Sequence, residues 1–485
     1  MKLTDPQLFR RGCYVGGEWR DAATGDTFEV TNPATGETIG TVPCMNVEDT
    51  RDSIEIADQA WAGWRAMPAK ARAVTLRRWY DLVMENQEDL AVIMTTEQGK
   101  PQPEARGEVV YAASFIEWFA EEGKRVYGDV INHPAPGHRI VVIKQPIGVA
   151  AAITPWNFPA AMITRKCAPA LAAGCPVIVK PAEQTPYSAL ALAELADRAG
   201  IPPGVFNVIT GDPEPIGGEL TGNPKVRKLS FTGSTEIGKL LMRQCAGSVK
   251  KISLELGGNA PFIVFNDADI DAAVAGAMAS KYRNTGQTCV CANRFLVQEE
   301  VYVEFTEKLT QAVKDLNVGS GLDKNVQQGP LIDMQAVSKV ETHIEDAVSK
   351  GARVITGGRR HALGGTYFEP TVLTNVNTAM LLTREETFGP VAPLISFRDD
   401  DEAIRIANDT PFGLAAYFYS RDIGKIWRVA ETLEFGIVGV NEGIISNEVA
   451  PFGGVKESGL GREGSKYGID EYLEIKYLCL GGIDN

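Results

Sequence analysis

Two cysteines, Cys289 and Cys291, stand one residue apart in the polar, glycine-containing stretch RNTGQTCVCANR. A thiol in such a place can act as a nucleophile, bind a metal, form a disulfide or pack in a core. Zinc needs about four ligands, but the sequence has no second C-x-C or C-x-x-C pair and its four histidines are dispersed. No metal site is therefore expected, and the polar surroundings favour an active-site loop.

A nucleophilic thiol needs a base and a donor for the oxyanion that its attack creates. No histidine neighbours the cysteines, so the candidate bases are carboxylates. Glu255 ends the apolar run ISLEL before a Gly-Gly turn, where burial would raise its pKa toward that of a general base; a strand residue facing water is the alternative. Asn157, bracketed by prolines in ITPWNFPAA, is an amide donor or the cap of a helix starting near Pro159.

Two strand ends carry groups that suit a nucleotide. The first, VIVKPAEQTP, presents Lys180 and Glu183, and the second, KLSFTGSTEIGKLL, places Gly233 and Ser234 at a helix start that would accept an anion. The fingerprint G-x-G-x-x-G is absent, so a glycine turn with an N-cap is the simpler interpretation of the second stretch. Glu183 would accept hydrogen bonds from ribose hydroxyls and repel a 2′-phosphate, unless it is a solvated surface glutamate.

The elements that must position these residues follow from the apolar pattern. Residues 48–127 have helical periodicity, whereas 149–265 alternate short apolar runs with helical stretches, which indicates a parallel sheet covered by helices. A second α/β stretch spans about 260 to 450. Residues 139–148 alternate like a strand with a proline suited to an edge, and the strand-like tail 470–482 is expected to pair with them or with another subunit.

Composition and charge exclude several classes of protein. The chain has 485 residues and a formal net charge of −14, which argues against nucleic-acid binding and requires a local basic cluster for any anionic substrate. No apolar run reaches the roughly 20 residues that span a bilayer, and the first residues lack the apolar core of a signal peptide. Eight scattered cysteines make a reducing cytoplasm the expected location.

The motifs together resemble the aldehyde dehydrogenase superfamily over essentially the full length of the chain. Their specificity lies in the combination and order of TPWNFP (154–159), KPAEQTP (180–186), FTGSTEIG (231–238), LELGGNAP (254–261), GQTCVCANR (286–294), EETFGP (385–390) and PFGGVKESGLGREG (451–464). Within the superfamily, the chain is most similar to the succinate-semialdehyde dehydrogenases and their near relatives, the glutarate-semialdehyde dehydrogenases. The phrases that carry this likeness include AMITRK, GQTCVCANR, ISNEVAPFGG and GREGSKYGIDEYLEIKY.

The resemblance implies an α/β fold in three parts. A Rossmann-like NAD(P)-binding domain would comprise residues 1–127 and 147–258, and an α/β catalytic domain would comprise 259–465. A small β oligomerisation arm would comprise 128–146 and 466–485. The expected assembly is a homo-oligomer, either a dimer or a tetramer.

The resemblance also implies roles for matching residues. Cys289 would be the nucleophile and Glu255 the general base, while Asn157 and the Cys289 backbone N–H would form the oxyanion hole. Lys180 and Glu386 would bracket the ribose hydroxyls. The positions that match cofactor-binding residues are Trp156, Lys180, Glu183, Gly233, Ser234, Leu256, Glu386 and Phe388.

The implied substrate is an ω-carboxy aldehyde. Arg165, Arg283 and Ser446 match the residues that hold the distal carboxylate, which suits the fork geometry of arginine. We expect oxidation of succinic semialdehyde to succinate through a cysteine thiohemiacetal and thioester, with glutaric semialdehyde or a broader aldehyde range as the alternative. A non-redox thiol hydrolase or acyltransferase using Cys289 is the alternative from another class.

Two expectations concern the cofactor and the second cysteine. The cofactor is NAD or NADP, and the acidic Glu183 favours NAD because several NADP-using bacterial relatives carry serine there. Packing behind the loop is favoured for Cys291 over a role as a reversible redox partner of Cys289, since a disulfide across one residue would need a rearranged loop.

Overall fold

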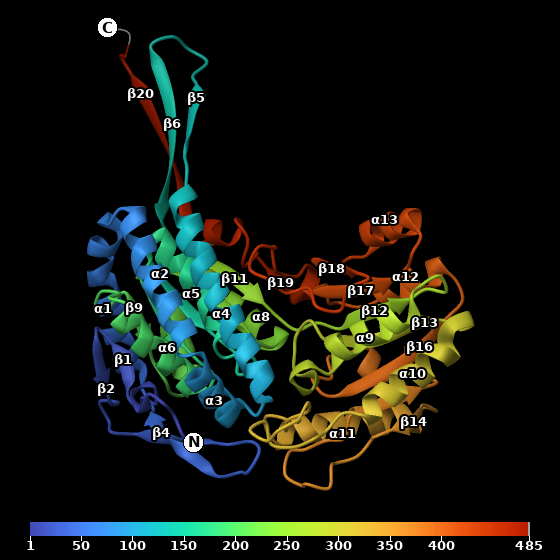
Figure 1. Cartoon of the computed structure of the whole chain (residues 1–485). Coiled ribbons are helices and arrows are strands. Elements are labelled where there is room, and N and C mark those ends of the chain that lie inside the picture. Colours follow the sequence, from blue (N-terminus) through green and yellow to red (C-terminus); the bar gives the residue numbers. More distant parts are fainter. Residues whose placement is uncertain (484–485) are drawn as a thin grey trace.

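The computed structural model describes residues 1–483 as two sheet-based lobes lying side by side, with a long three-stranded arm projecting from the first lobe (Figure 1). The first residues of the chain belong to the first lobe, and the last described residues belong to the arm. Among the described residues, no helix is both long and apolar enough to cross a membrane.

The first lobe is built on an eight-stranded sheet whose five central strands are parallel. The strands, in sheet order, are β19 (Gly459–Leu460), β11 (Lys251–Glu255), β10 (Val226–Thr232), β7 (Val149–Ile153), β8 (Val177–Lys180), β9 (Phe206–Val208), β1 (Cys13–Val15) and β2 (Glu18–Arg20). A separate hairpin pairs β3 (Thr27–Thr31) with β4 (Thr38–Pro43).

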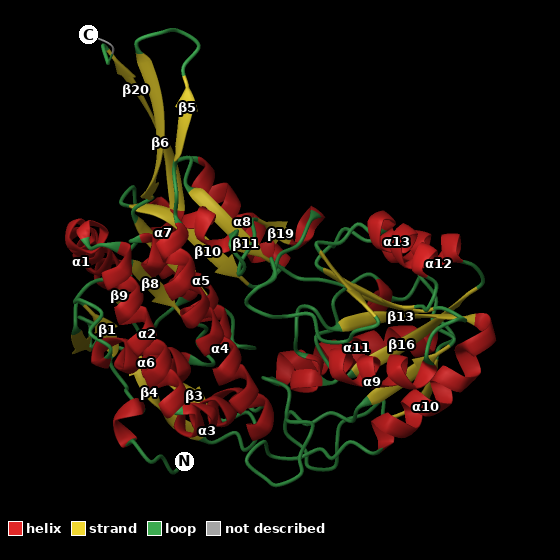
Figure 2. Cartoon of the chain, turned by 45° about the horizontal axis from the view of Figure 1, so that its top comes forward, coloured by secondary structure: helices red, strands yellow, loops and turns green. Residues whose placement is uncertain are grey.

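Helices cover both faces of this sheet (Figure 2), which explains the uninterrupted apolar runs of its central strands. Ala150 and Val177 face one core, whereas Ala151 and Ile178 face the other. The first core is closed mainly by α2 (Ala69–Glu85), α3 (Gln87–Gln98), α4 (Gln102–Glu122), α5 (Ala161–Ala173) and α6 (Pro186–Arg198). The second is closed by α1 (Val47–Ala66), α7 (Pro213–Gly222) and α8 (Thr235–Ala246).

The second lobe contains a seven-stranded sheet that is parallel apart from its antiparallel edge strand β14. Its strands, in sheet order, are β14 (Arg353–Thr356), β15 (Thr371–Thr374), β16 (Val391–Phe397), β13 (Ala292–Gln298), β12 (Ala260–Val264), β17 (Ala415–Tyr419) and β18 (Ile437–Val440). The helices of this lobe are α9 (Ile270–Lys281), α10 (Tyr302–Lys314), α11 (Met334–Ser349), α12 (Asp400–Asn408) and α13 (Ile423–Thr432).

The arm is an antiparallel sheet of β5 (Asp129–Asn132), β6 (His138–Pro146) and β20 (Leu473–Gly481). The tail strand β20 pairs with β6 from Leu473 opposite Pro146 to Gly481 opposite His138, which is one of the two partners expected from the sequence. The expectation of an edge strand is wrong, because β6 lies in the middle. Pro146 is accommodated there because it occupies the end of the strand.

One segment of the second half of the chain returns to the first lobe. Strand β19 pairs with β11, with Gly459 opposite Glu255, and the residues that follow it lie beside α5. The residue ranges named above for the three parts remain our proposal for the domain division. This return explains how residues near position 460 reach a site formed by both lobes.

Candidate active site

A cavity of about 460 Å³ lies between the two lobes and collects most of the residues singled out from the sequence. Its lining includes Trp156, Asn157, Arg165, Gly233, Ser234, Leu256, Arg283, Cys289, Glu386, Phe388 and Ser446. Lys180, Glu183, Glu255 and Cys291 lie outside this lining. Trp156 and Ser446, which are 290 positions apart in the chain, therefore meet in one place.

The loop carrying Cys289 is shaped by three consecutive left-handed residues. Asn284, Thr285 and Gly286 have φ angles of 50°, 57° and 77°. A side chain at Gly286 would place its Cβ 2.2 Å from the carbonyl oxygen of Gly389, so only glycine fits this close approach. This tight turn directs Cys289 to the cavity.

The surroundings of Cys289 favour the neutral thiol over the thiolate. Burial raises its pKa to about 12, and the charge of Arg165 acts in the opposite direction. Since the thiolate is the nucleophile, this thiol must lose its proton as it attacks or when a ligand changes the surroundings.

Cys291 has a different environment. Its side chain is buried, and its sulfur donates hydrogen bonds to the carbonyl oxygens of Ser280 at 3.1 Å and Lys281 at 3.3 Å, at the end of α9. Burial also raises the pKa of this thiol. We therefore propose packing, rather than chemistry, as its role.

Asn157 lies in the loop between β7 and α5. Its Nδ2 donates to the carbonyl oxygen of Gln287 at 3.1 Å, and its side chain borders the cavity. Helix α5 begins after Ala160 without a side-chain cap. The alternative interpretation of Asn157 as a helix cap is therefore wrong.

Glu255 ends β11 beside the cavity, and both of its carboxyl oxygens are buried without a hydrogen-bond partner among the described residues. A Cβ at Gly453 would lie 2.8 Å from Oε1 of Glu255, so glycine is needed at that position. Burial, and next the charge of Glu463, raise the pKa of Glu255 well above its usual range. The alternative of a strand residue facing water is wrong.

The cavity wall also contains Trp156, Glu386 and Phe388. The rings of Trp156 and Phe388 meet edge to face at 5.5 Å, and Phe388 has a φ of 55°, a strained conformation for an aromatic residue. Oε1 of Glu386 accepts the N–H of Gly258 at 3.2 Å, and burial raises the pKa of Glu386 to about 7.

The strand ends of the first lobe fit a dinucleotide. Ser234 caps α8 by accepting the N–H of Ile237 at 3.3 Å, and the hydroxyl of Thr232, in the cavity wall, is buried without a partner among the described residues. Lys180, at the end of β8, contacts Glu183. An ammonium, carboxylates and a helix N-terminus are groups that bind ribose hydroxyls and phosphates. Glu183 is thus paired rather than freely solvated.

Two arginines, Arg165 and Arg283, line the cavity. Arg165 is buried and donates to Glu463 at 2.6 Å, and Lys166 contacts the same carboxylate. Arg283 forms no ion pair within residues 1–483, and its guanidinium lies 5.4 Å from the centre of the Phe158 ring. Ser446 also lines the cavity.

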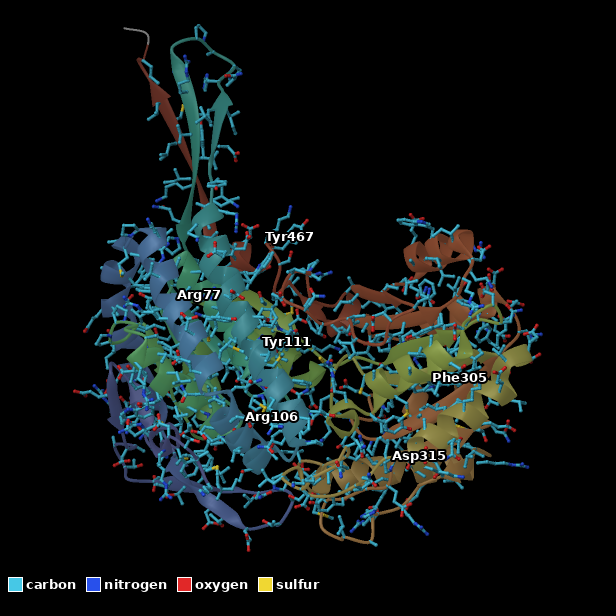
Figure 3. The ribbon with its side chains drawn as sticks, in the orientation of Figure 1. Arg77, Arg106, Tyr111, Phe305, Asp315 and Tyr467 are labelled. Carbon is cyan, nitrogen blue, oxygen red and sulfur yellow. The ribbon has the colours of Figure 1, made fainter. Side chains whose placement is uncertain are left out.

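Several residues of the site escaped the sequence analysis. Tyr111, labelled on α4 in Figure 3, lines the cavity, and its buried hydroxyl has no partner among the described residues. Glu463 belongs to the GREG motif, to which no role was assigned. Lys100 and Glu108 form a buried ion pair beside the site. Their charges, in a region of the sequence with helical periodicity, were the only sign of a special role. No group of three or more potential metal ligands occurs within residues 1–483.

Comparison with known proteins gives consistent matches over the whole chain. The model of the aldehyde dehydrogenase family matches residues 19–478. The chain is 66% identical to glutarate-semialdehyde dehydrogenase of Pseudomonas aeruginosa over 100% of both chains. It is 64% identical to the NADP(+) succinate-semialdehyde dehydrogenase of Escherichia coli, covering 99% of this chain and 100% of that one.

A solved structure is similarly close. The crystal structure of succinate-semialdehyde dehydrogenase from Burkholderia pseudomallei has a TM-score of 0.99 and 65% sequence identity, covering 99% of this chain and 100% of that chain.

Proposed function

The chain belongs to the aldehyde dehydrogenase family, and we propose that it oxidises ω-carboxy aldehydes, with succinic semialdehyde as the main substrate and succinate as the product. The observation that supports this substrate class is Arg283, a cation without an ion-pair partner among the described residues, in the same cavity as Cys289. A carboxylate on the substrate would supply the missing partner.

The reaction follows from the groups around Cys289. The thiol releases its proton to solvent, its sulfur attacks the aldehyde carbon, and the carbonyl oxygen becomes an oxyanion that the Asn157 amide and the Cys289 backbone N–H stabilise. A bound NAD(P) would supply the acceptor for the hydride that leaves the thiohemiacetal. Glu255 then takes a proton from water as that water attacks the thioester, which releases the acid and restores the thiol.

The residues that would hold the cofactor are on the first lobe and on the Glu386 segment. Lys180 and Glu386 would bind ribose hydroxyls, and Ser234 lies at the helix start that would accept a phosphate. Glycine is needed at position 233, because a Cβ there would lie 2.4 Å from the Phe231 ring.

NAD is the preferred cofactor in this proposal, because the Glu183 carboxylate would repel the 2′-phosphate of NADP. The relative from Escherichia coli, which is 64% identical to this chain, is named for NADP. Its name therefore implies the opposite cofactor preference. A direct comparison of kcat/KM with the two cofactors decides between them.

The distinction between four- and five-carbon substrates is small in energy. One methylene group in a pocket changes binding by about 1–3 kcal/mol, and relatives of this chain carry both names. The test is kcat/KM for succinic semialdehyde, glutaric semialdehyde and butyraldehyde with each cofactor. The proposal expects kcat/KM to be higher for both semialdehydes than for butyraldehyde, which is neutral. A higher kcat/KM for butyraldehyde would contradict it.

The arm supports a homo-oligomer. Ile475, Tyr477 and Leu480 on β20 are 71%, 58% and 46% exposed, and exposed apolar side chains on a projecting sheet are typical of an interface. We propose that the arm binds a second copy of the chain. Sedimentation equilibrium distinguishes a dimer from a tetramer, and a monomer would contradict the proposal.

A further inference from the structure

A buried ion pair lies behind the part of the cavity wall that Asn157 forms. Lys100, in the connection between α3 and α4, contacts Glu108 of α4, and each side chain is 1% exposed. Burying two charges costs desolvation energy, so such a pair contributes little to stability by itself. The position of this pair suggests a task in the site.

The pair contacts the loop that carries Asn157 at two points, in its middle and at its end. Nζ of Lys100 donates to the carbonyl oxygen of Asn157 at 2.7 Å, and Oε1 of Glu108 accepts the N–H of Ala160 at 2.9 Å. Nζ of Lys100 also lies 4.0 Å from the centre of the Phe158 ring, which is a cation–π distance. The ammonium and the carboxylate thus fix successive parts of one short loop.

Asn284 joins this loop to the one that carries Cys289. Its Nδ2 donates to the carbonyl oxygens of Asn157 at 3.0 Å and Gln287 at 3.2 Å, and its Oδ1 accepts Nε2 of Gln98 at 3.0 Å. The Asn157 side chain donates to the same Gln287 oxygen. The amide donor and the nucleophile loop are therefore connected through shared backbone carbonyls.

From this geometry we propose that Lys100, held by Glu108, is a positioning residue for the Asn157 carboxamide. It acts on the oxyanion of the transition state without touching the aldehyde. The inference rests on the proposed role of Asn157. Since a displacement of about 1 Å in a catalytic group can cost about a hundredfold in rate, loss of the Lys100 contact lowers kcat and leaves binding of the substrate carboxylate unchanged.

The test replaces both charges, because Lys100→Met alone would leave Glu108 buried without a counterion and destabilise the fold. In the Lys100→Met/Glu108→Gln variant, the glutamine oxygen can still accept the N–H of Ala160. We expect kcat to fall about tenfold to a hundredfold, with KM for succinic semialdehyde within about twofold of wild type. Hydrolysis of p-nitrophenyl acetate without cofactor, which also forms an oxyanion, is expected to fall by the same factor.

A second background separates positioning from a general packing defect. In an Asn157→Ala enzyme, the Lys100→Met/Glu108→Gln change is expected to cost less than about threefold, because the amide that it positions is already absent. The same fold-loss in both backgrounds would overturn the proposal. Alkylation of Cys289 by iodoacetamide forms no oxyanion, so its rate in the Lys100→Met/Glu108→Gln variant is expected to stay within about twofold of wild type. A large loss of the alkylation rate would also overturn the proposal.

The Asn157→Ala variant alone separates a failure of the oxyanion role of Asn157 from a failure of the positioning role of Lys100. A near-normal rate in that variant would show that the oxyanion role is wrong, and the positioning role would be wrong with it. A large loss in that variant, together with equal losses from the Lys100→Met/Glu108→Gln change in both backgrounds, would overturn the positioning role alone.

Discussion

The carboxylate of Glu463 lies 2.6 Å from Nε of Arg165, and the same carboxylate contacts Lys166. Arg165 is also fixed against the Phe452 ring at 4.0 Å. Two cations share one acid, so this cluster stays cationic but has little freedom to move. Arg283, by contrast, has no ion pair within the described chain, which makes it the cation best able to pair with a substrate.

Replacing Arg283 by alanine tests this difference. Loss of a charge-assisted hydrogen bond costs about 1.5–3 kcal/mol, so we expect kcat/KM for succinic semialdehyde to fall about tenfold to a hundredfold, mainly through KM. Butyraldehyde, which has no carboxylate, is expected to change little. The matched control is Arg106→Ala, a surface arginine of α4 paired with Glu88 (Figure 3). Equal losses for charged and neutral aldehydes would remove Arg283 from substrate binding.

Replacing Asn157 by alanine tests the oxyanion donor. One such donor contributes about 3 kcal/mol to the transition state, so we expect kcat to fall about a hundredfold or more. Binding of the substrate carboxylate is expected to persist, because Arg283 is intact. A kcat close to that of the wild type would exclude Asn157 from this role.

Glu255→Gln is expected to abolish turnover and to stabilise the fold at higher pH. Burial raises the pKa of Glu255 above the usual 4.5, so the folded protein keeps a proton that the unfolded chain releases. Stability is therefore lost as pH rises from about 4.5 toward the raised pKa. Urea unfolding at about pH 5 and about pH 8 measures the free energy of unfolding. The variant should be more stable than wild type only at the higher pH. Equal effects at both would contradict the burial argument.

Glu183→Ser tests the cofactor preference. Removal of the carboxylate removes its repulsion of a 2′-phosphate, so the ratio of kcat/KM with NADP to that with NAD is expected to rise about tenfold. The acidic side chain already contacts Lys180, and the serine would also free that ammonium for the phosphate. An unchanged ratio, or a wild-type enzyme that strongly prefers NADP, would show that Glu183 does not set the preference.

Much of the site was predictable because it lies in contiguous motifs at the ends of strands. The predicted aldehyde dehydrogenase fold is confirmed. Glu255 ends β11 and Ser234 caps α8 as the local patterns indicated, and the carboxyl ends of parallel strands meet at one edge of a sheet. Local pattern was therefore enough to place these two residues.

The remaining features depend on contacts that local pattern does not encode. Arg165 and Glu463 are 298 residues apart, and Lys100 and Asn157 are 57 apart. The middle position of β6, which overturned the expectation of an edge strand, depends on pairing with the distant β20. Burial is likewise a property of the assembled fold, and it decided between the two interpretations of Glu255.

The most direct test of the central claim is the mass of the covalent intermediate. Glu255→Gln enzyme is mixed with succinic semialdehyde and cofactor, then quenched in acid and digested for peptide mass spectrometry. The account predicts a succinyl group on Cys289 that appears only when cofactor is present, because hydride must leave before the thioester forms. A modified residue other than Cys289, or no acyl adduct in an enzyme that still reduces cofactor, would contradict it.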